Sequence, residues 1–303
     1  MQKNKENNDR IIKFLAYDGK VSVKCINSTY LVETARKIHD LSPTVTAAMG
    51  RLLSITCIMG ADMKNTEDSM TIQVKGNGPI GTMTTVVSNF PKVKGYVVNS
   101  LVDIPLREDG KIDVGTAVGK QGMIYIMKDI GLKEQYSGIS PIISGEIAED
   151  FTNYFATSEQ TPTVVALGVL VDKNGVKSSG GYMINLMPDA TEKEIEKIEQ
   201  NIKNAVPISK MLDDNLSLIE IAKKVTGDNN IKIIEENIIP VYECNCSREK
   251  IEKGLISIGE KELKDIIQKD GKAEIVCNFC NTKYDFSKIE LEKLVEEGKS
   301  SLK

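Results

Sequence analysis

Two close cysteine pairs near the C-terminal end, Cys244-Asn245-Cys246 and Cys277-Asn278-Phe279-Cys280, decide how this part of the chain folds. Thirty residues, 247 to 276, separate the pairs, so that four sulfurs can converge on one point. Four thiolates around one Zn²⁺ make a closed tetrahedral site, in which each short pair chelates the metal. The two sulfurs of Cys-x-Cys are also close enough to bond to each other. The stretch therefore predicts a zinc site that can also be oxidised.

The residues around the pairs predict a small module with few apolar side chains. Two short helices are expected over 247–259 and 260–271, and a strand over 273–276 leads into the second pair. A second strand follows over 282–286, and Ser287 then caps a terminal helix. A module of this size needs an additional cross-link, such as a bound metal or disulfides, to be stable. Zinc supplies an apparent ~10–16 kcal/mol in structural sites at neutral pH, so the fold of the module is tied to the redox state of its sulfurs.

Two other functions remain open for a four-cysteine module of this kind. One is a permanent zinc staple that never switches. The other is a zinc-ribbon regulatory protein that binds nucleic acid. Residues 241 to 303 hold twelve Lys or Arg against thirteen Asp or Glu, so no basic face for nucleic acid is evident.

The composition of the whole chain indicates an acidic globular protein. The 303 residues carry a net charge of −4, which argues against a nucleic-acid binder. The N-terminus lacks the apolar segment of a secretory signal. No apolar run approaches the ~18 residues of a membrane-spanning helix. These features predict a cytoplasmic location without membrane contact, where clustered cysteines bind metal or sense redox state, and where Cys25 and Cys57 are small buried residues.

The first part of the chain predicts an α+β domain, because strands and hairpins alternate with a few helices. Asp18-Gly19 between two apolar runs predicts a hairpin, and Ser42-Pro43 predicts the start of a buried helix over 44–59. Further strands are expected over 70–75, 82–87, 95–98, 123–129, 163–171 and 180–186, with a helix over 146–155. The domain is expected to end near Pro188.

Two patterns in this domain invite enzymatic interpretations. Residues 76–81 spell G-x-G-x-x-G after a strand, but a dinucleotide site needs a helix to follow, and a β-branched run follows instead. A glycine-rich connection between strands is therefore expected. Glu146, Glu149 and Asp150 form a carboxylate cluster, which helical spacing favours as a solvated or ion-paired face. A thiol–disulfide oxidoreductase would place its Cys-x-x-Cys at the start of a helix, not after a strand.

Residues 189–238 predict short charged helices. Thr191 to Glu194 and Ser217 to Glu220 are capping boxes, in which the first side chain and the glutamate satisfy each other's backbone amides. The helices carry thin apolar stripes, and short helices gain most of their stability from what they dock against. An ordinary connector and a metastable linker that unfolds when its dock is lost both fit, and the local pattern favours the connector.

The chain resembles the redox-regulated heat-shock protein 33 chaperones nearly from end to end. The cysteine pairs, with Ser247-Arg248 after the first, match the zinc motif of that family. Further similar patches, highly specific in combination, are Ser42-Pro43-Thr44, Gly50-Arg51-Leu52-Leu53, Gly76 to Gly81, Gly95-Tyr96, Gly145 to Asp150, Ser158-Glu159-Gln160 and Gly180-Gly181.

The resemblance implies a chaperone core domain over 1–188, a metastable helical linker over 189–238 and a Cys₄ zinc redox-switch domain over 239–303. It reverses the preference for an ordinary connector. One Zn²⁺ per chain on Cys244, Cys246, Cys277 and Cys280 would keep the reduced form inactive. Oxidants, helped by unfolding conditions, would form the disulfides Cys244–Cys246 and Cys277–Cys280 and release the metal.

The resemblance also implies a function without catalysis. The oxidised protein would be an ATP-independent holdase that binds unfolding client proteins and prevents their aggregation under oxidative stress. It would form a homodimer when activated. Neither Cys25 nor Cys57 belongs to the matched motif.

Overall fold

The computed structural model describes residues 7–131 and 134–301, the last three of these by backbone alone, and forms two units, Met1–Glu243 and Cys244–Lys303. The first unit is built on two β-sheets. Its five-stranded sheet has the order β10-β1-β2-β9-β8. The bounds of these strands are Lys232–Ile238 for β10, Arg10–Ala16 for β1, Val21–Asn27 for β2, Gly175–Leu186 for β9 and Thr163–Asp172 for β8.

The predicted hairpin at Asp18-Gly19 is confirmed. β1 and β2 pair antiparallel from Arg10 opposite Asn27 to Ala16 opposite Val21. A short 3₁₀ turn, Tyr17–Gly19, joins them, with Asp18 and Gly19 at φ of 55° and 98°. Left-handed backbone of this kind favours glycine and aspartate, which explains why this dipeptide turns the chain.

The second sheet of the unit has six strands in the order β11-β5-β4-β3-β6-β7. It includes the four strands predicted between residues 70 and 129 and two that the sequence did not predict, β7 and β11. The bounds are Val241–Tyr242 for β11, Lys92–Val97 for β5, Thr82–Ser88 for β4, Ser69–Gly76 for β3, Gly122–Asp129 for β6 and Tyr136–Pro141 for β7.

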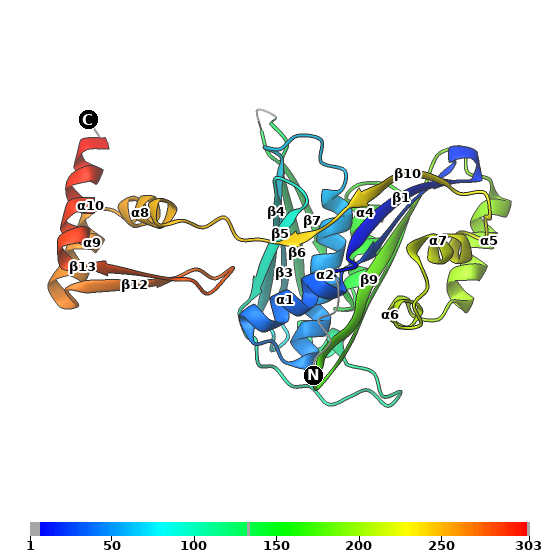
Figure 1. Cartoon of the computed structure of the whole chain (residues 1–303), viewed down its shortest axis with the longest axis horizontal. Helices are drawn as coiled ribbons and strands as arrows, with labels where there is room; N and C mark the ends of the chain where they lie inside the picture. Colours follow the sequence, from blue (N-terminus) through cyan, green and yellow to red (C-terminus); the bar gives the residue numbers. More distant parts are fainter. Residues whose placement is uncertain (1–6, 132–133, 302–303) are drawn as a thin grey trace. The chain divides into compact units, whose positions relative to one another are not determined.

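A buried helix, α2 (Pro43–Gly60), lies between the two sheets and contacts β2, β8 and β9 of one and β3, β4 and β5 of the other (Figure 1). Ser42 caps it by accepting from the backbone N–H of Val45, and Pro43 occupies the first turn, as predicted. Almost every residue of α2 is buried, because both of its faces meet a sheet. None of the helices in the described part of the chain is long and apolar enough to cross a membrane.

The glycine-rich stretch 76–81 connects β3 to β4, as expected, and no helix follows it. It packs against a short helix that the sequence did not predict, α3 (Val114–Val118). The N–H groups of Asn77, Gly78 and Ile80 donate to carbonyls of residues 121, 118 and 117. A Cβ at Gly78 would lie 2.3 Å from the carbonyl oxygen of Ala117. The glycines thus allow close backbone packing, and these amides are not available to a phosphate.

The prediction of a solvated or ion-paired carboxylate face is confirmed for Glu146 but was wrong for Asp150. This residue lies in α4 (Ile147–Thr157) and is fully buried, where Oδ1 accepts from the backbone N–H groups of Ile143 and Ser144 at 2.8 and 3.0 Å. Glu146, which precedes the helix, is ion-paired with Arg51. The carboxylates therefore hold the preceding loop and α2 in place.

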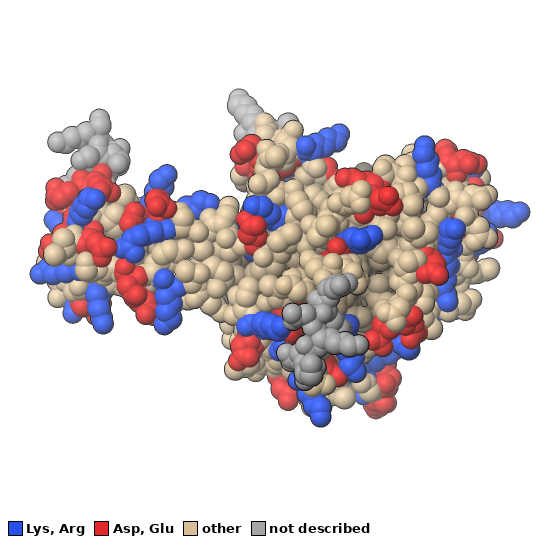
Figure 2. All heavy atoms as spheres, viewed as in Figure 1, with Lys and Arg blue, Asp and Glu red and all other residues tan. Residues whose placement is uncertain are grey.

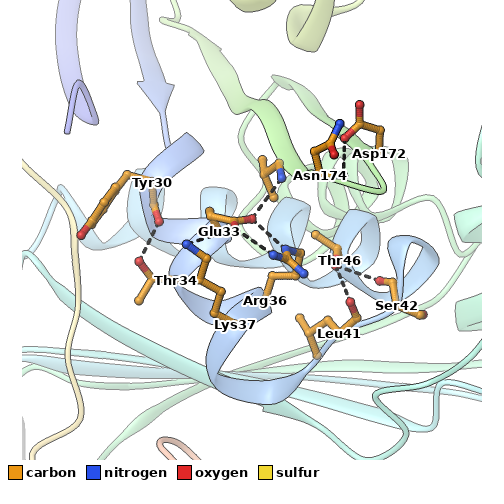
Figure 3. A network of polar contacts seen from close by, with 11 residues as sticks. Tyr30, Glu33, Thr34, Arg36, Lys37, Leu41, Ser42, Thr46, Asp172 and Asn174 are labelled. Atoms are coloured by element: carbon orange, nitrogen blue, oxygen red, sulfur yellow. Dashed lines mark hydrogen bonds and ion pairs between the residues drawn. The ribbon is translucent and has the colours of Figure 1, made fainter. Parts of the chain in front are cut away.

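One surface helix, α1 (Thr29–His39), is tied to the β8–β9 turn by Glu33 (Figure 3). Its carboxylate accepts two bonds from Arg36, at 2.7 and 2.8 Å, and one from the backbone N–H of Val176 at 3.0 Å. Partial burial acts to raise the pKa of Glu33, but the bonds from Arg36 and Val176 outweigh it and lower this pKa to about 2.

Glu33 is expected to contribute to acid sensitivity. Its folded pKa is below the unfolded value of about 4.3, so its stabilisation is complete above pH ~4.3 and is lost as pH falls towards the folded pKa. Glu33→Gln should lower the free energy of unfolding at pH 7 by ~1–2 kcal/mol, after allowance for solvent screening. Urea titrations at pH 7 and near pH 2.5 should show the two proteins converging in acid. A gap that persists in acid would contradict this assignment.

Residues 189–238 belong to the first unit and pack on its five-stranded sheet. Both capping boxes are confirmed, at the starts of α5 (Glu192–Asn204) and α7 (Leu218–Thr226), with α6 (Ile208–Asp213) between them. The expectation of helices throughout was wrong for residues 232–238, which form β10 at the edge of the five-stranded sheet. Hydrogen bonding to β1 decides this conformation.

The five-stranded sheet has two apolar faces. One face packs on α2 and belongs to a larger apolar cluster, which we call the main core. Its buried members include Ile11, Ile26, Leu52, Ile55, Cys57 and Met183. The other face packs on the helices of residues 189–238 in a separate apolar cluster, which we call the linker cluster. Its buried members are Ile12, Phe14, Ala16, Val21, Val23, Cys25, Tyr182, Ile184, Ile198, Ile208, Met211, Leu218, Ile221, Ala222 and Val225.

Glycine makes room for α6 on this face. Gly168 of β8 lies opposite Gly180 of β9. A Cβ at Gly168 would lie 2.9 Å from Cγ2 of Ile208 and 3.0 Å from both N and Oγ of Ser209. All three nearest atoms belong to α6, so a side chain at this position would clash with that helix.

The second unit confirms the predicted order of two helices, a hairpin and a terminal helix. An antiparallel pair, β12 (Lys272–Val276) and β13 (Lys283–Ser287), joins α8 (Arg248–Ser257) and α9 (Glu260–Lys269) to α10 (Lys288–Ser301). Its apolar core is small. The buried members are Leu255, Leu263, Phe286, Leu291, Leu294 and Val295.

Candidate metal centre

The second unit brings its four cysteines together. The sulfurs of Cys244, Cys246, Cys277 and Cys280 all lie within 4.8 Å of one another. Two distances cross between the pairs, 3.8 Å from Cys244 to Cys277 and 3.3 Å from Cys246 to Cys280. Cys277 is buried and the other three are partly buried.

The second pair is positioned by the hairpin. Cys277 directly follows β12, and its N–H donates to the carbonyl of Thr282 at 3.0 Å. The N–H groups of Cys280 and Asn281 both donate to the carbonyl of Cys277, at 3.3 and 2.8 Å. Asn281 has a φ of 57°, which turns the chain back into β13. This turn places both sulfurs on one side of the hairpin.

The first pair is held by the start of α8. Ser247 caps this helix by accepting from the N–H of Lys250 at 3.3 Å, and the Lys250 ammonium donates to the carbonyl of Asn245 at 2.8 Å. The Arg248 side chain lies 4.3 Å from the centre of the Phe286 ring and donates to Glu290 at 2.7 Å. The residue after the first pair is thus fixed to the hairpin and to α10.

Two side chains that the sequence did not predict contact the sulfurs. The Tyr284 hydroxyl donates to Sγ of Cys246 at 3.1 Å, and Oγ1 of Thr282 lies 3.2 Å from Sγ of Cys280. Contacts of this kind orient metal ligands and tune their basicity. Their only signal in the sequence is proximity to Cys280, with alternation along a short strand.

The surroundings affect the thiols differently. Burial raises the pKa of Cys244 to about 12 and also raises the pKa of Cys277. Burial acts in the same direction on Cys280, but the hydrogen bonds of Thr282 and of the neighbouring cysteines outweigh it and lower this pKa to about 7. The bond to Cys246 raises the pKa of Tyr284 to about 12. The thiolate is the form that binds metals, and Cys280 reaches it most readily of the three shifted thiols.

Zinc fits this donor set. A tetrahedral Zn–S bond of about 2.3 Å requires sulfurs about 3.8 Å apart. The distances of 3.3 and 3.8 Å and the upper bound of 4.8 Å bracket that separation. Four thiolates without an open position are typical of a structural rather than a catalytic zinc site. The hairpin setting of Cys277 and Cys280 also disagrees with an oxidoreductase, whose Cys-x-x-Cys begins a helix.

The remaining cysteines are fully buried, as expected, and lie in the other unit. Cys57 is in α2 within the main core, and Cys25 is in the linker cluster. Burial raises the pKa of both thiols well above the usual range. Neither is a nucleophile in this state.

Sequence comparison relates the chain to one family. The model of that family, described as Hsp33 protein, matches residues 9–287. A 33 kDa chaperonin of Geobacillus sp. (strain WCH70) is 45% identical over 288 residues, covering 94% of this chain and 97% of that protein. A 33 kDa chaperonin of Staphylococcus carnosus is 43% identical over 291 residues, covering 95% and 98%.

Comparison with solved structures points to the same family. The crystal structure of the 33 kDa chaperonin from Thermotoga maritima superposes with a TM-score of 0.87 at 36% sequence identity. The match covers 96% of this chain and 99% of that one.

Proposed function

Because the chain belongs to the Hsp33 family, we propose that it is an oxidation-activated holdase chaperone whose four cysteines bind one Zn²⁺ when reduced. The observation that carries the proposal is the convergence of four sulfurs within 4.8 Å in a unit with a small apolar core. Bound zinc would hold the four thiolates together and stabilise the fold of that unit. Loss of the zinc would remove this stabilisation. A site whose ligands can be oxidised would thus link the fold of the unit to the presence of oxidant.

Oxidation can proceed by ordinary thiol chemistry. A thiolate attacks peroxide and becomes a sulfenic acid with release of hydroxide, and a second thiolate then displaces hydroxide from that sulfur to form the disulfide. We propose the pairs Cys244–Cys246 and Cys277–Cys280. Their support is the short loop within each pair, which favours closure once the unit unfolds. Two disulfides leave no thiolate for zinc.

The linker is the element that responds in this proposal. Residues 189–238 form the metastable segment between a core domain over 1–188 and the switch domain over 239–303. Beside the pairing of β1 with β10, several polar contacts join the core to the linker. Tyr17 donates its N–H to Asp228 at 2.7 Å and its hydroxyl to the Thr226 carbonyl at 2.6 Å, and Lys20 pairs with Glu194 at 3.0 Å. Release of this segment would expose the apolar face formed by β1, β2 and β9.

Such a surface suits unfolding proteins as clients, which agrees with the family's role as chaperones rather than enzymes. We further propose that the activated form is a homodimer and that it acts in the cytoplasm. Basic and acidic side chains are interspersed on the face shown in Figure 2, so that face offers no basic surface for a nucleic acid.

The proposed function is tested by zinc release coupled to client protection. Treatment with hypochlorite, or with peroxide at elevated temperature, is expected to release about one zinc per chain, measured with a colorimetric chelator. Suppression of light scattering from a heat-aggregating client should appear at the same time. Strong suppression by the reduced, zinc-loaded protein that vanishes on oxidation would refute the proposal.

Linker release has its own readout in the two buried cysteines. Cys25 lies in the linker cluster, and Cys57 lies in the main core. After oxidation, alkylation followed by mass spectrometry should label Cys25 and leave Cys57 unlabelled, because only the first depends on the linker for burial. Before oxidation both should be protected. Equal protection of both thiols in the oxidised protein would show that the linker stays docked.

A further inference from the structure

The segment that leads into the first cysteine pair is fixed to the first unit. β11 consists only of Val241 and Tyr242 and runs parallel to β5 at the edge of the six-stranded sheet. The N–H of Val241 donates to the carbonyl of Pro91, and the N–H of Glu243 donates to the carbonyl of Val93, both at 3.0 Å. Lys92 forms an ion pair with Glu243. A strand of two residues forms few backbone hydrogen bonds, so its pairing with the sheet edge is weak by itself.

The Tyr242 side chain extends this pairing. Its hydroxyl donates to the carbonyl of Gly95 at 2.6 Å and accepts from the N–H of the same residue at 3.3 Å. A strand neighbour would satisfy the edge of β5 with these same two groups. The phenol oxygen thus acts as one more residue of β11, at the point where the backbone leaves the sheet.

His39 completes the arrangement. Its Nε2 lies 2.8 Å from the Tyr242 hydroxyl, and the two rings meet edge to face at 6.3 Å. The hydroxyl has one proton, which goes to the Gly95 carbonyl, so Nε2 of His39 is the donor. A side chain of α1, the backbone of β5 and the end of β11 therefore meet at one oxygen. Tyr242 also packs on the main core.

The chain on either side of Tyr242 explains what this arrangement can do. Cys244 lies two residues after it. β10, the end of the linker, lies before it, separated from β11 only by Ile239 and Pro240. A movement of Cys244 can therefore be transmitted along the chain to the linker only if β11 moves as well.

We infer that β11 is a latch, closed by the bonds of Tyr242 to Gly95 and His39, and that its opening transmits loss of the metal centre to the linker. The inference rests on the proposed function and adds the element that couples the metal centre to the linker. While the latch is closed, β10 stays paired with β1 and the linker helices stay docked. When Cys244 moves, the two-residue strand leaves β5 and the end of the linker loses its anchor.

Tyr242→Phe tests the latch in the reduced, zinc-loaded protein. The variant keeps the packed ring and removes the hydroxyl, which leaves both polar groups of Gly95 without this partner. Alkylation of Cys25 should become about tenfold faster, because the loss of these bonds shifts the opening equilibrium by that order. Alkylation of Cys57 should not change. Hydrogen exchange of the Gly95 amide should also accelerate.

Tyr154→Phe is the matched control, because it removes a buried phenol hydroxyl that donates to Glu159 at 2.7 Å, away from β11. It should leave the Cys25 rate unchanged. A second test uses the exposed pair. Lys92→Glu should accelerate Cys25 alkylation a fewfold, and Lys92→Glu with Glu243→Lys should restore the wild-type rate.

The outcomes separate the latch from the proposed function. If oxidation exposes Cys25 in the wild type but Tyr242→Phe and Lys92→Glu both behave as the wild type when reduced, the latch is wrong and the switch stands. If oxidation fails to expose Cys25 in the wild type, the proposed linker release itself fails. Acceleration in both variants, with rescue by the charge swap, supports the latch.

Discussion

Replacing Cys277 by serine is expected to lower zinc affinity by roughly two to three orders of magnitude, because an apparent ~10–16 kcal/mol is shared by four thiolates. Cys277 is the most buried of the four cysteines, and its backbone carbonyl accepts the two amides that form the turn. Competition with a chelator at neutral pH measures the affinity. The same variant should also protect a client from aggregation without oxidant, because the unit has lost its staple.

Gly254→Ala provides the control in the same unit. Gly254 lies inside α8, and a Cβ there would meet no atom within 4 Å. Alanine should stabilise the helix by up to ~1 kcal/mol and leave zinc affinity unchanged. Equal chelator resistance of Cys277→Ser and the wild type would remove Cys277 from the proposed ligand set. Lost zinc without client protection would instead break the link between metal and activity.

Gly168→Ala is expected to activate the protein while its zinc remains bound. The three nearest atoms to the added Cβ belong to Ile208 and Ser209, so the new methyl group pushes on α6 alone. Overpacking of this kind costs ~1–3 kcal/mol, which favours the undocked linker by about 5- to 150-fold. The strand itself should gain stability, because alanine suits a strand better than glycine does.

The readouts for Gly168→Ala are client protection and Cys25 alkylation in the reduced protein, with zinc content measured in parallel. Gly168→Val should have a larger effect, and Cys57 should stay protected in both variants. Loss of Cys57 protection would show that the core, not the linker, had been disrupted. A reduced Gly168→Val protein with wild-type Cys25 protection would exclude this glycine from the dock.

The elements that the sequence predicted well carry their signal locally. The hairpin at Asp18-Gly19, the capped helix after Ser42 and both capping boxes depend on turn and cap chemistry within a few residues. β10 was missed because Ile233-Ile234-Glu235-Glu236 lacks strand alternation, and pairing with β1, more than 200 residues away in the chain, decides its conformation. The burial of Asp150 was not predicted, because spacing along a helix does not reveal that the preceding loop folds over this side chain.

The candidate site was predictable to a similar degree. The spacing of the cysteines was enough to predict that four sulfurs converge, which the structure confirms. The contact of Tyr284 with Cys246 was not predictable, because it depends on how the hairpin and the first pair approach each other. The position of Cys25 under the linker helices also required the structure, since only the sheet decides which face a strand residue occupies.

The linker cluster gives the protein a thermal response of its own. Undocking the helices would transfer their buried isoleucine, leucine, methionine and valine side chains into water. Exposure of apolar surface raises the heat capacity, so the free energy of docking is a curved function of temperature that falls with increasing steepness on heating. If the linker is released as proposed, its docking depends on temperature while the cysteines respond to oxidant, and warming should lower the degree of oxidation needed for release.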